Sequence, residues 1–312
     1  MVEWKNLDEL NSFKELEACE KVDLKTVMSG NEGAERVKTY SCAMAEGLTY
    51  NYAAKAVDAK VLEAIKKLAE EAQLSEKFEA LYNGEMVNTG EKRLVLHQLC
   101  RGQLGEDVIA DGVNKREFYV KQQKRIAEFA EKVHNGTITN AAGEKFTTVV
   151  QIGIGGSDLG PRAIYIALEN WARKNNTLKM EAKFISNVDP DDAAAVLNSI
   201  DVAHSLFVLV SKSGTTLETL TNEAFVKDAL KNAGLDPANH MVAVTSETSP
   251  LAKNEGYLDA FYMDNYIGGR YSSSSAVGCA VLSLAFGPKV FADFLDGAAA
   301  EDKLACEKDV MK

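Results

Sequence analysis

Hydroxyl side chains are concentrated in one short run of the sequence, residues 211–219. Residues 211–216 within it contain four hydroxyl side chains and one positive charge: Ser211, Lys212, Ser213, Thr215 and Thr216. If a helix begins within the run, its first N–H groups and its dipole add to these donors and favour one dianionic phosphate. The alternative is helix capping, with Thr215 or Thr216 as the N-cap and Glu218 in the first turn. A cap needs only one such side chain, so the run predicts a phosphate-binding loop.

A second run is rich in glycine: Gly153-Ile154-Gly155-Gly156-Ser157-Asp158-Leu159-Gly160-Pro161. Its glycines would let backbone N–H groups approach an anion before a helix starts. The dinucleotide fingerprint requires Gly where Asp158 stands, and a P-loop requires Lys and then Ser or Thr where Pro161 and Arg162 stand. The alternative is a tight turn that serves only strand–helix packing. Because neither nucleotide motif is present, we expect a small phosphorylated ligand without a nucleotide.

A lone arginine, Arg270, follows two glycines in residues 265–272. On a solvated surface such an arginine forms ion pairs of little energetic value. Beside two anion-binding loops it can instead stabilise negative charge that develops on a reacting oxygen. This position predicts an electrophilic role for Arg270.

The elements that must position these loops are short apolar runs alternating with amphipathic segments. The apolar runs predict five strands, at residues 147–154, 183–188, 205–211, 241–246 and 261–264. The amphipathic segments between them are residues 161–173, 191–199, 216–233 and 250–255. This alternation predicts a parallel sheet covered by helices on both faces, with ligands at the carboxyl ends of the strands. Residues 1 to about 140 are predicted to be mostly helical, with helices over 57–74 and 115–133 and a glycine cap at Gly136.

Composition narrows the possible partners. The 312 residues include 35 Lys+Arg and 46 Asp+Glu, which gives a formal net charge of −11. A surface that binds nucleic acids or anionic membranes carries many positive charges, and a chain this acidic is not expected to have one of these as its main partner. The five cysteines are odd in number and form no CxxC pair, which argues against a disulfide framework or a zinc site. The first residues show no basic segment followed by an apolar one, as a secretory signal peptide would. The apolar stretch 276–286 is shorter than the roughly 20 residues of a membrane span. We therefore expect a cytoplasmic protein.

Five segments together resemble the glucose-6-phosphate isomerase family, which is built from sugar isomerase (SIS) domains. The glycine-rich run resembles the family's first sugar-phosphate loop, and residues 211–219 resemble its phosphate-binding loop. The family signature is matched by residues 265–278, NYIGGRYSSSSAVG. An upstream segment of the family is matched by residues 88–97, which end in His97. A stretch that follows the family's first SIS domain is matched by residues 294–298. The resemblance extends from about residue 40 to residue 312.

The resemblance implies an aldose–ketose isomerase of glycolysis and gluconeogenesis that interconverts glucose 6-phosphate and fructose 6-phosphate without cofactor or metal. Arg270 would stabilise the enediolate. Eight residues would hold the substrate phosphate: Gly156, Ser157, Ser211, Lys212, Ser213, Thr215, Thr216 and Gly269. The family also forms homodimers with shared active sites, so a homodimer is implied for the full-length protein. His97 lies in an apolar run, and we expect a hydrogen-bonded, buried histidine rather than a catalytic acid.

The sequence departs from the family where the reaction needs a base. The family's Gly-Val-Glu motif, whose Glu is the base, is absent, as are the ring-opening His and the C-terminal Lys that follow in the family. We therefore expect an N-terminal portion of an isomerase that is inactive alone. Its expected parts are a helical region at 1–140 that belongs to the larger domain, an SIS-type αβα sandwich at 141–288, and the start of a helical segment at 289–312. The alternatives are a non-catalytic SIS module that binds a sugar phosphate, and an isomerase of another hexose phosphate.

Overall fold

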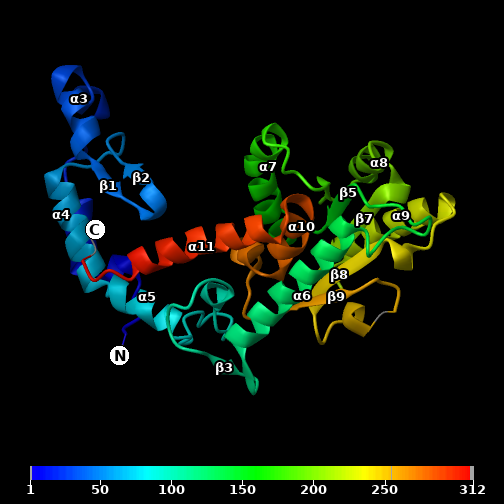
Figure 1. The fold of residues 1–312 in the computed structure, drawn as a ribbon. Coiled ribbons are helices and arrows are strands. Elements are labelled where there is room, and N and C mark those ends of the chain that lie inside the picture. The colour runs from blue at the N-terminus through cyan, green and yellow to red at the C-terminus, as the bar shows by residue number, and fades with distance from the viewer. Residues whose placement is uncertain (1, 254, 310–312) are drawn as a thin grey trace. The chain divides into compact units, whose positions relative to one another are not determined.

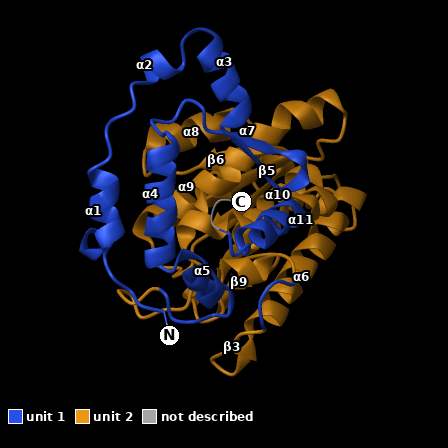
Figure 2. Cartoon of the chain, turned by 90° about the vertical axis from the view of Figure 1, so that its left-hand side faces the viewer, with its two compact units in different colours: residues 1–87, 103–106, 296–312 blue, residues 88–102, 107–295 orange. Residues whose placement is uncertain are grey.

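The computed structural model describes residues 2–253 and 255–309. The chain is divided by its contacts into two compact units, coloured separately in Figure 2. Unit 1 comprises residues 1–87, 103–106 and 296–312, and unit 2 comprises residues 88–102 and 107–295. The predicted division into domains at about residues 140 and 288 stays a prediction.

Unit 1 is mostly helical among its described residues. Its helices are α1 (Asn11–Glu17), α2 (Leu24–Val27), α3 (Gly30–Thr39), α4 (Ala59–Glu71), α5 (Leu74–Tyr82) and the end of α11 (Pro288–Ala305). A short antiparallel hairpin joins β1 (Ser41–Ala43) to β2 (Thr49–Asn51). The helix predicted over 57–74 is shorter, because the carboxylate of Asp58 accepts a hydrogen bond from the Val61 N–H at 2.9 Å and caps α4.

Unit 2 contains a five-stranded parallel sheet, as predicted (Figure 1). Its strands are β5 (Thr148–Ile152), β6 (Glu181–Ile185), β7 (Ser205–Val210), β8 (Met241–Ser246) and β9 (Ala260–Met263). They lie in the order β6-β5-β7-β8-β9, and each neighbouring pair is parallel. The chain moves from β5 to one side and then returns to place β7 on the other side, which creates a topological switch point between β5 and β7.

Helices cover both faces of this sheet. Alternate residues of the central strand β7 point to opposite faces, and all six are buried. On one face Leu206 and Val208 pack with α6 (Lys115–Asn135), α7 (Leu159–Lys174) and α10 (Ala276–Phe286). On the other face Phe207 and Leu209 pack with α8 (Pro190–Asn198) and α9 (Leu217–Asn232). The unit is therefore a three-layer αβα sandwich, which confirms the predicted fold class.

Helix α10 explains the longest apolar stretch of the sequence. All of its 11 residues are buried, so it lies within the core and shows apolar residues on every side. Ser275 precedes it as the N-cap and accepts a hydrogen bond from the Val277 N–H at 3.3 Å. A helix of this kind is apolar because protein surrounds it.

Helix α6 contributes to the sheet-face core although it lies before residue 140. It ends at Asn135, and Gly136 adopts the left-handed conformation (φ 83°) that was expected at its cap. Ile126 and Phe129 of this helix pack into the same core as α10. A short hairpin of β3 (Ile109–Ala110) and β4 (Val113–Asn114) precedes it. The segment predicted over 250–255 forms a 3-10 helix at Pro250–Lys253, and Asn254 lies outside the described residues.

Replacing Leu209 by alanine should destabilise unit 2 by about 2–5 kcal/mol, because the side chain is fully buried in the central strand. Urea unfolding followed by the fluorescence of Trp171, in a Trp4→Phe background, would measure this change. Leu159→Ala is the matched control, since Leu159 is 67% exposed. It should change the free energy of unfolding by less than about 0.5 kcal/mol. Equal effects from both variants would contradict the assignment of Leu209 to the core.

Candidate functional site

A cavity of about 280 Å³ lies at the carboxyl ends of β5 and β7, where the switch point occurs. Three loops contribute to it, one after β5, one after β7 and one after β9. Its lining residues are Ile154, Gly156, Ser157, Val210, Ser211, Lys212, Ser213, Thr216, Thr219, Met263, Gly269, Ser272 and Val277. The structure thus brings together seven of the predicted site residues in one cavity.

The loop after β7 folds around its own hydroxyls. Gly214 has a left-handed backbone (φ 67°), and its N–H donates to Ser211 Oγ at 3.2 Å. A Cβ at Gly214 would lie 2.1 Å from Ser249 Oγ. Both the left-handed backbone and this close contact therefore favour glycine at this position. Thr215 donates from its N–H and its Oγ1 to Ser213 Oγ at 3.2 and 3.1 Å. Thr215 is exposed and does not line the cavity, unlike the other hydroxyl residues predicted from this run.

The capping alternative for this run agrees with the positions of Thr216 and Glu218, but the capping hydrogen bond is not formed. Thr216 does occupy the N-cap position of α9, but its side chain makes no capping hydrogen bond. Its Oγ1 lies instead 3.5 Å from Ser211 Oγ and 3.4 Å from Ser213 Oγ. The first N–H groups of α9 are therefore not capped by this hydroxyl, and they form the positive end of a 16-residue helix beside the cavity.

The loops after β5 and β9 meet backbone to backbone at two glycines. A Cβ added to Gly156 would lie 2.4 Å from the Cα and carbonyl carbon of Gly269. Ser272 Oγ lies 3.0 Å from Gly156 O and 2.9 Å from Gly269 O, so its single hydroxyl hydrogen bridges the two loops. The structure thus brings these two glycines into direct contact.

Packing accounts for other glycines of the β5 loop. A Cβ on Gly153 would lie 2.5 Å from Ser157 O, and one on Gly160 would lie 2.0 Å from Ser273 Oγ. These positions agree with the tight-turn alternative. The same loop nevertheless places Ser157 on the wall of the cavity, so it performs both tasks.

The electrostatics of the cavity favour an anion. Lys212 is its only charged lining residue among the described part of the chain. Burial lowers the pKa of Lys212, and the nearby charge of Arg93 lowers it further. Its Nζ donates to the Ile267 carbonyl at 3.3 Å.

The two acidic residues near the cavity have other partners or places. Asp158, which is buried beside the cavity, forms an ion pair with Arg162 at 2.8 Å, and burial raises the pKa of Asp158. Glu218 lies in the first turn of α9, as expected.

Arg270 is exposed and lies next in the chain to Gly269, which lines the cavity. Within the described residues its guanidinium forms no hydrogen bond or ion pair.

Two residues that line the cavity, Thr219 and Ser272, were not predicted from the sequence. The signal for Thr219 was present, because a residue three positions after Thr216 shares its helix face.

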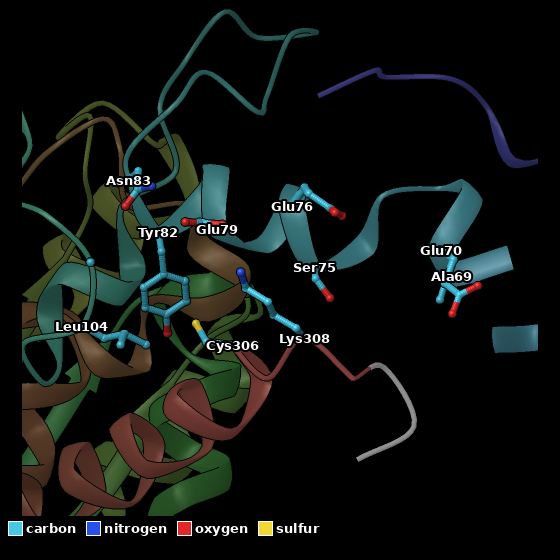
Figure 3. A pocket seen from close by; sticks show the side chains of 11 residues that line it. Ala69, Glu70, Ser75, Glu76, Glu79, Tyr82, Asn83, Leu104, Cys306 and Lys308 are labelled. Atoms are coloured by element: carbon cyan, nitrogen blue, oxygen red, sulfur yellow. The ribbon is translucent and has the colours of Figure 1, made fainter. Parts of the chain in front are cut away.

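A second cavity, of about 440 Å³, lies in unit 1 (Figure 3). Figure 3 shows Tyr82, Cys306 and Lys308 close together, with Glu70 farther along. Its wall carries three carboxylates, those of Glu70, Glu76 and Glu79. Three carboxylates repel a dianionic phosphate, so the smaller cavity in unit 2 is the better candidate for an anionic ligand.

Unit 2 is a doubly wound α/β unit with hydroxyls, one lysine and a helix N-terminus at its switch point, an arrangement that suits a small anionic ligand. The phosphoglucose isomerase family matches residues 51–310. This chain belongs to that family.

Individual relatives agree. The chain is 57% identical, over 99% of its length, to a glucose-6-phosphate isomerase of Treponema denticola and 53% identical to one of Treponema pallidum. It also superposes on a glucose-6-phosphate isomerase crystal structure from Chlamydia trachomatis with a TM-score of 0.84 and 37% identity, over 99% of this chain and 58% of that one. The chain spans 59% of the length of the Treponema denticola relative.

Two features are absent from the described residues. None of their helices is both long and apolar enough to cross a membrane. They also contain no group of three or more His, Cys, Asp or Glu side chains arranged to hold a metal ion.

Gly156→Ala should destabilise unit 2 by about 1–3 kcal/mol, since the new methyl group would overlap the backbone of Gly269. Urea unfolding of the two proteins would measure the difference. Gly90→Ala is the control, because the nearest atom to its added Cβ lies 3.8 Å away. A Gly156→Ala variant as stable as Gly90→Ala would show that the two loops do not touch.

His97 and His134 should titrate below the ordinary histidine pKa of 6.5, and His204 above it. Burial lowers the pKa of His97 and of His134, and the hydrogen bond with Asp201 raises that of His204. Below about pH 6.5 the half-buried rings of His97 and His134 bind fewer protons in the folded than in the unfolded state, so they make stability fall as pH falls. A ¹H NMR titration would test this order. A midpoint for His97 at or above that of His204 would contradict it.

Proposed function

We propose that the whole protein is a glucose-6-phosphate isomerase, which interconverts glucose 6-phosphate and fructose 6-phosphate in glycolysis and gluconeogenesis. The observation that supports this most is the coincidence of family membership with a hydroxyl-rich cavity at the switch point. The relatives that match almost all of this chain carry that name.

The cavity would hold the phosphate group of the hexose. Ser157, Ser211, Ser213 and Thr216 offer hydroxyl donors, and Lys212 offers a charge close to them. The first N–H groups of α9 add the positive end of the helix dipole. Phosphate needs several donors that converge, and hydrogen bonds to a charged group are about twice as strong as neutral ones. Thr215 would join only if its side chain turned from Ser213.

Arg270 would stabilise the enediolate. Isomerisation moves a proton between adjacent carbons, and negative charge develops on the oxygens of those carbons. An arginine beside a bound sugar phosphate would lower the energy of that state. The general base would be the glutamate that the family carries in its Gly-Val-Glu motif, because Asp158 is engaged by Arg162 and Glu218 belongs to the first helical turn.

The remaining expectations concern the assembled protein. The full-length protein would act as a homodimer, as the family resemblance implies, and in the cytoplasm. All five cysteines are free thiols, and Cys100 and Cys279 are buried, which is typical of a reducing compartment.

Thr216→Val in the full-length protein should raise KM for glucose 6-phosphate about 10- to 100-fold, because it removes a hydroxyl that would donate to a charged phosphate. A coupled assay of both reaction directions, and calorimetric titration with inorganic phosphate, would measure the change. Thr221→Val is the matched control. Its Oγ1 donates to the Leu217 carbonyl of its own helix at 2.9 Å, and it does not line the cavity.

Two results would contradict the proposal. One is an absence of turnover by the wild-type full-length protein with glucose 6-phosphate, set beside assays with mannose and glucosamine 6-phosphates. The other is a phosphate affinity that Thr216→Val leaves unchanged.

A further inference from the structure

Three consecutive carbonyls of the loop before Arg270 accept hydrogen bonds from two other segments, residues 96–97 and Lys212. The Tyr266 carbonyl accepts from the Leu96 N–H at 3.1 Å. The Ile267 carbonyl accepts from Lys212 Nζ at 3.3 Å, and the Gly268 carbonyl accepts from His97 Nε2 at 2.8 Å. Successive carbonyls of a surface loop usually face water, so this arrangement fixes the backbone immediately before Gly269 and Arg270.

His97 contacts the chain on both sides of Arg270. Its Nε2 reaches the Gly268 carbonyl, two residues before Arg270, and its ring meets the ring of Tyr271 edge-on, one residue after it. The two ring centroids are 6.2 Å apart with an interplanar angle of 81°, a favourable aromatic geometry. One side chain therefore brackets Arg270.

The segment that carries His97 is itself anchored. Leu96 and Leu99 are fully buried, and they pack with Cys100, Tyr119 and Ile267 in one apolar cluster. His97 begins the 3-10 helix His97–Cys100, which lies between these buried residues. Its ring thus projects from a fixed support and not from a mobile loop.

The base of the Arg270 loop is held as firmly. Asp264 Oδ1 accepts from Tyr119 Oη at 2.9 Å and from the Tyr266 N–H at 3.0 Å. The ammonium of Lys115, which is 7% exposed, lies 3.2 Å from Asp264 Oδ2. The loop is therefore tied at its start by Asp264 and along its length by the three carbonyl contacts. Arg270 and Tyr271, which follow it, are both exposed.

We propose that His97 is a positioning residue for Arg270: its Nε2–H holds the Gly268 carbonyl, and its ring holds Tyr271, so that the guanidinium is presented at the rim of the phosphate cavity. The proposal rests on the proposed isomerase function. A carbonyl accepts only, so His97 must carry its proton on Nε2. Burial lowers the pKa of His97 and so favours the neutral ring that this tautomer requires.

The test compares His97→Leu with His97→Gln in the full-length protein. Leucine removes the donor, whereas the glutamine amide places an N–H donor where Nε2 lies. His97→Leu should lower kcat about 10- to 100-fold with little change in KM, since small misplacement of a catalytic group carries losses of that order. His97→Gln should recover most of the loss. Hydrogen–deuterium exchange over residues 265–271 should become faster in His97→Leu and stay near wild type in His97→Gln.

His134 provides the matched control. Its Nε2 donates to the Leu284 carbonyl at 2.8 Å, so His134→Leu loses the same kind of hydrogen bond elsewhere in unit 2. It should leave kcat and the exchange of residues 265–271 unchanged. Tyr271→Leu is a second variant that does not endanger folding, because Tyr271 is 75% exposed. It should lower kcat by a smaller factor than His97→Leu.

Several outcomes overturn the positioning role. They are equal kcat values for the His97→Leu and His134→Leu variants, no recovery in His97→Gln, or unchanged exchange of residues 265–271 in His97→Leu. If the wild-type protein shows no isomerase activity, the proposed function fails, and the exchange comparison alone then decides the role of His97.

Discussion

Gly156 and Gly269 lack side chains, and this lets the loop after β5 meet the loop after β9 backbone to backbone. Strands β7 and β8 separate β5 from β9 in the sheet, so the second loop must pass over the carboxyl ends of two strands to make this contact. Ser272 holds the meeting point through both carbonyls. The cavity, the position of Gly269 and the path of the chain toward Arg270 all depend on this approach.

The sheet that supports the contact is stable because each of its faces is buried under a different set of helices. Leu206 and Leu209 of one strand belong to separate cores, one with α10 and one with α9. A parallel sheet covered in this way leaves its strand ends as the place where polar loops collect. The hydroxyls of the β7 loop could be exposed there to a ligand without weakening either core.

Much of the fold could be predicted from local pattern. The five strands, the parallel arrangement and the left-handed Gly136 followed from apolar runs and from the chemistry of single residues. Element ends were less accurate, as at Asp58, because a capping hydrogen bond decides where α4 begins. Thr216 stands at the N-cap position but makes no capping hydrogen bond, for a related reason. Its hydroxyl turns toward Ser211 and Ser213, and no sequence pattern shows which of two nearby partners a hydroxyl chooses.

The amino-acid sequence by itself determined the αβα class, the hydroxyl-rich loop at 211–216 and the likeness to a sugar-phosphate isomerase, because each depends on residue types that lie close together in the chain. The tertiary structure alone decided which of these residues share a cavity, that Thr215 turns away, and that Thr219 and Ser272 join them. It also decided that His97 contacts the residues on both sides of Arg270, although His97 is 171 positions from Gly268 in the chain. Contacts over such separations arise from the packing of whole layers, and local propensity carries no information about them.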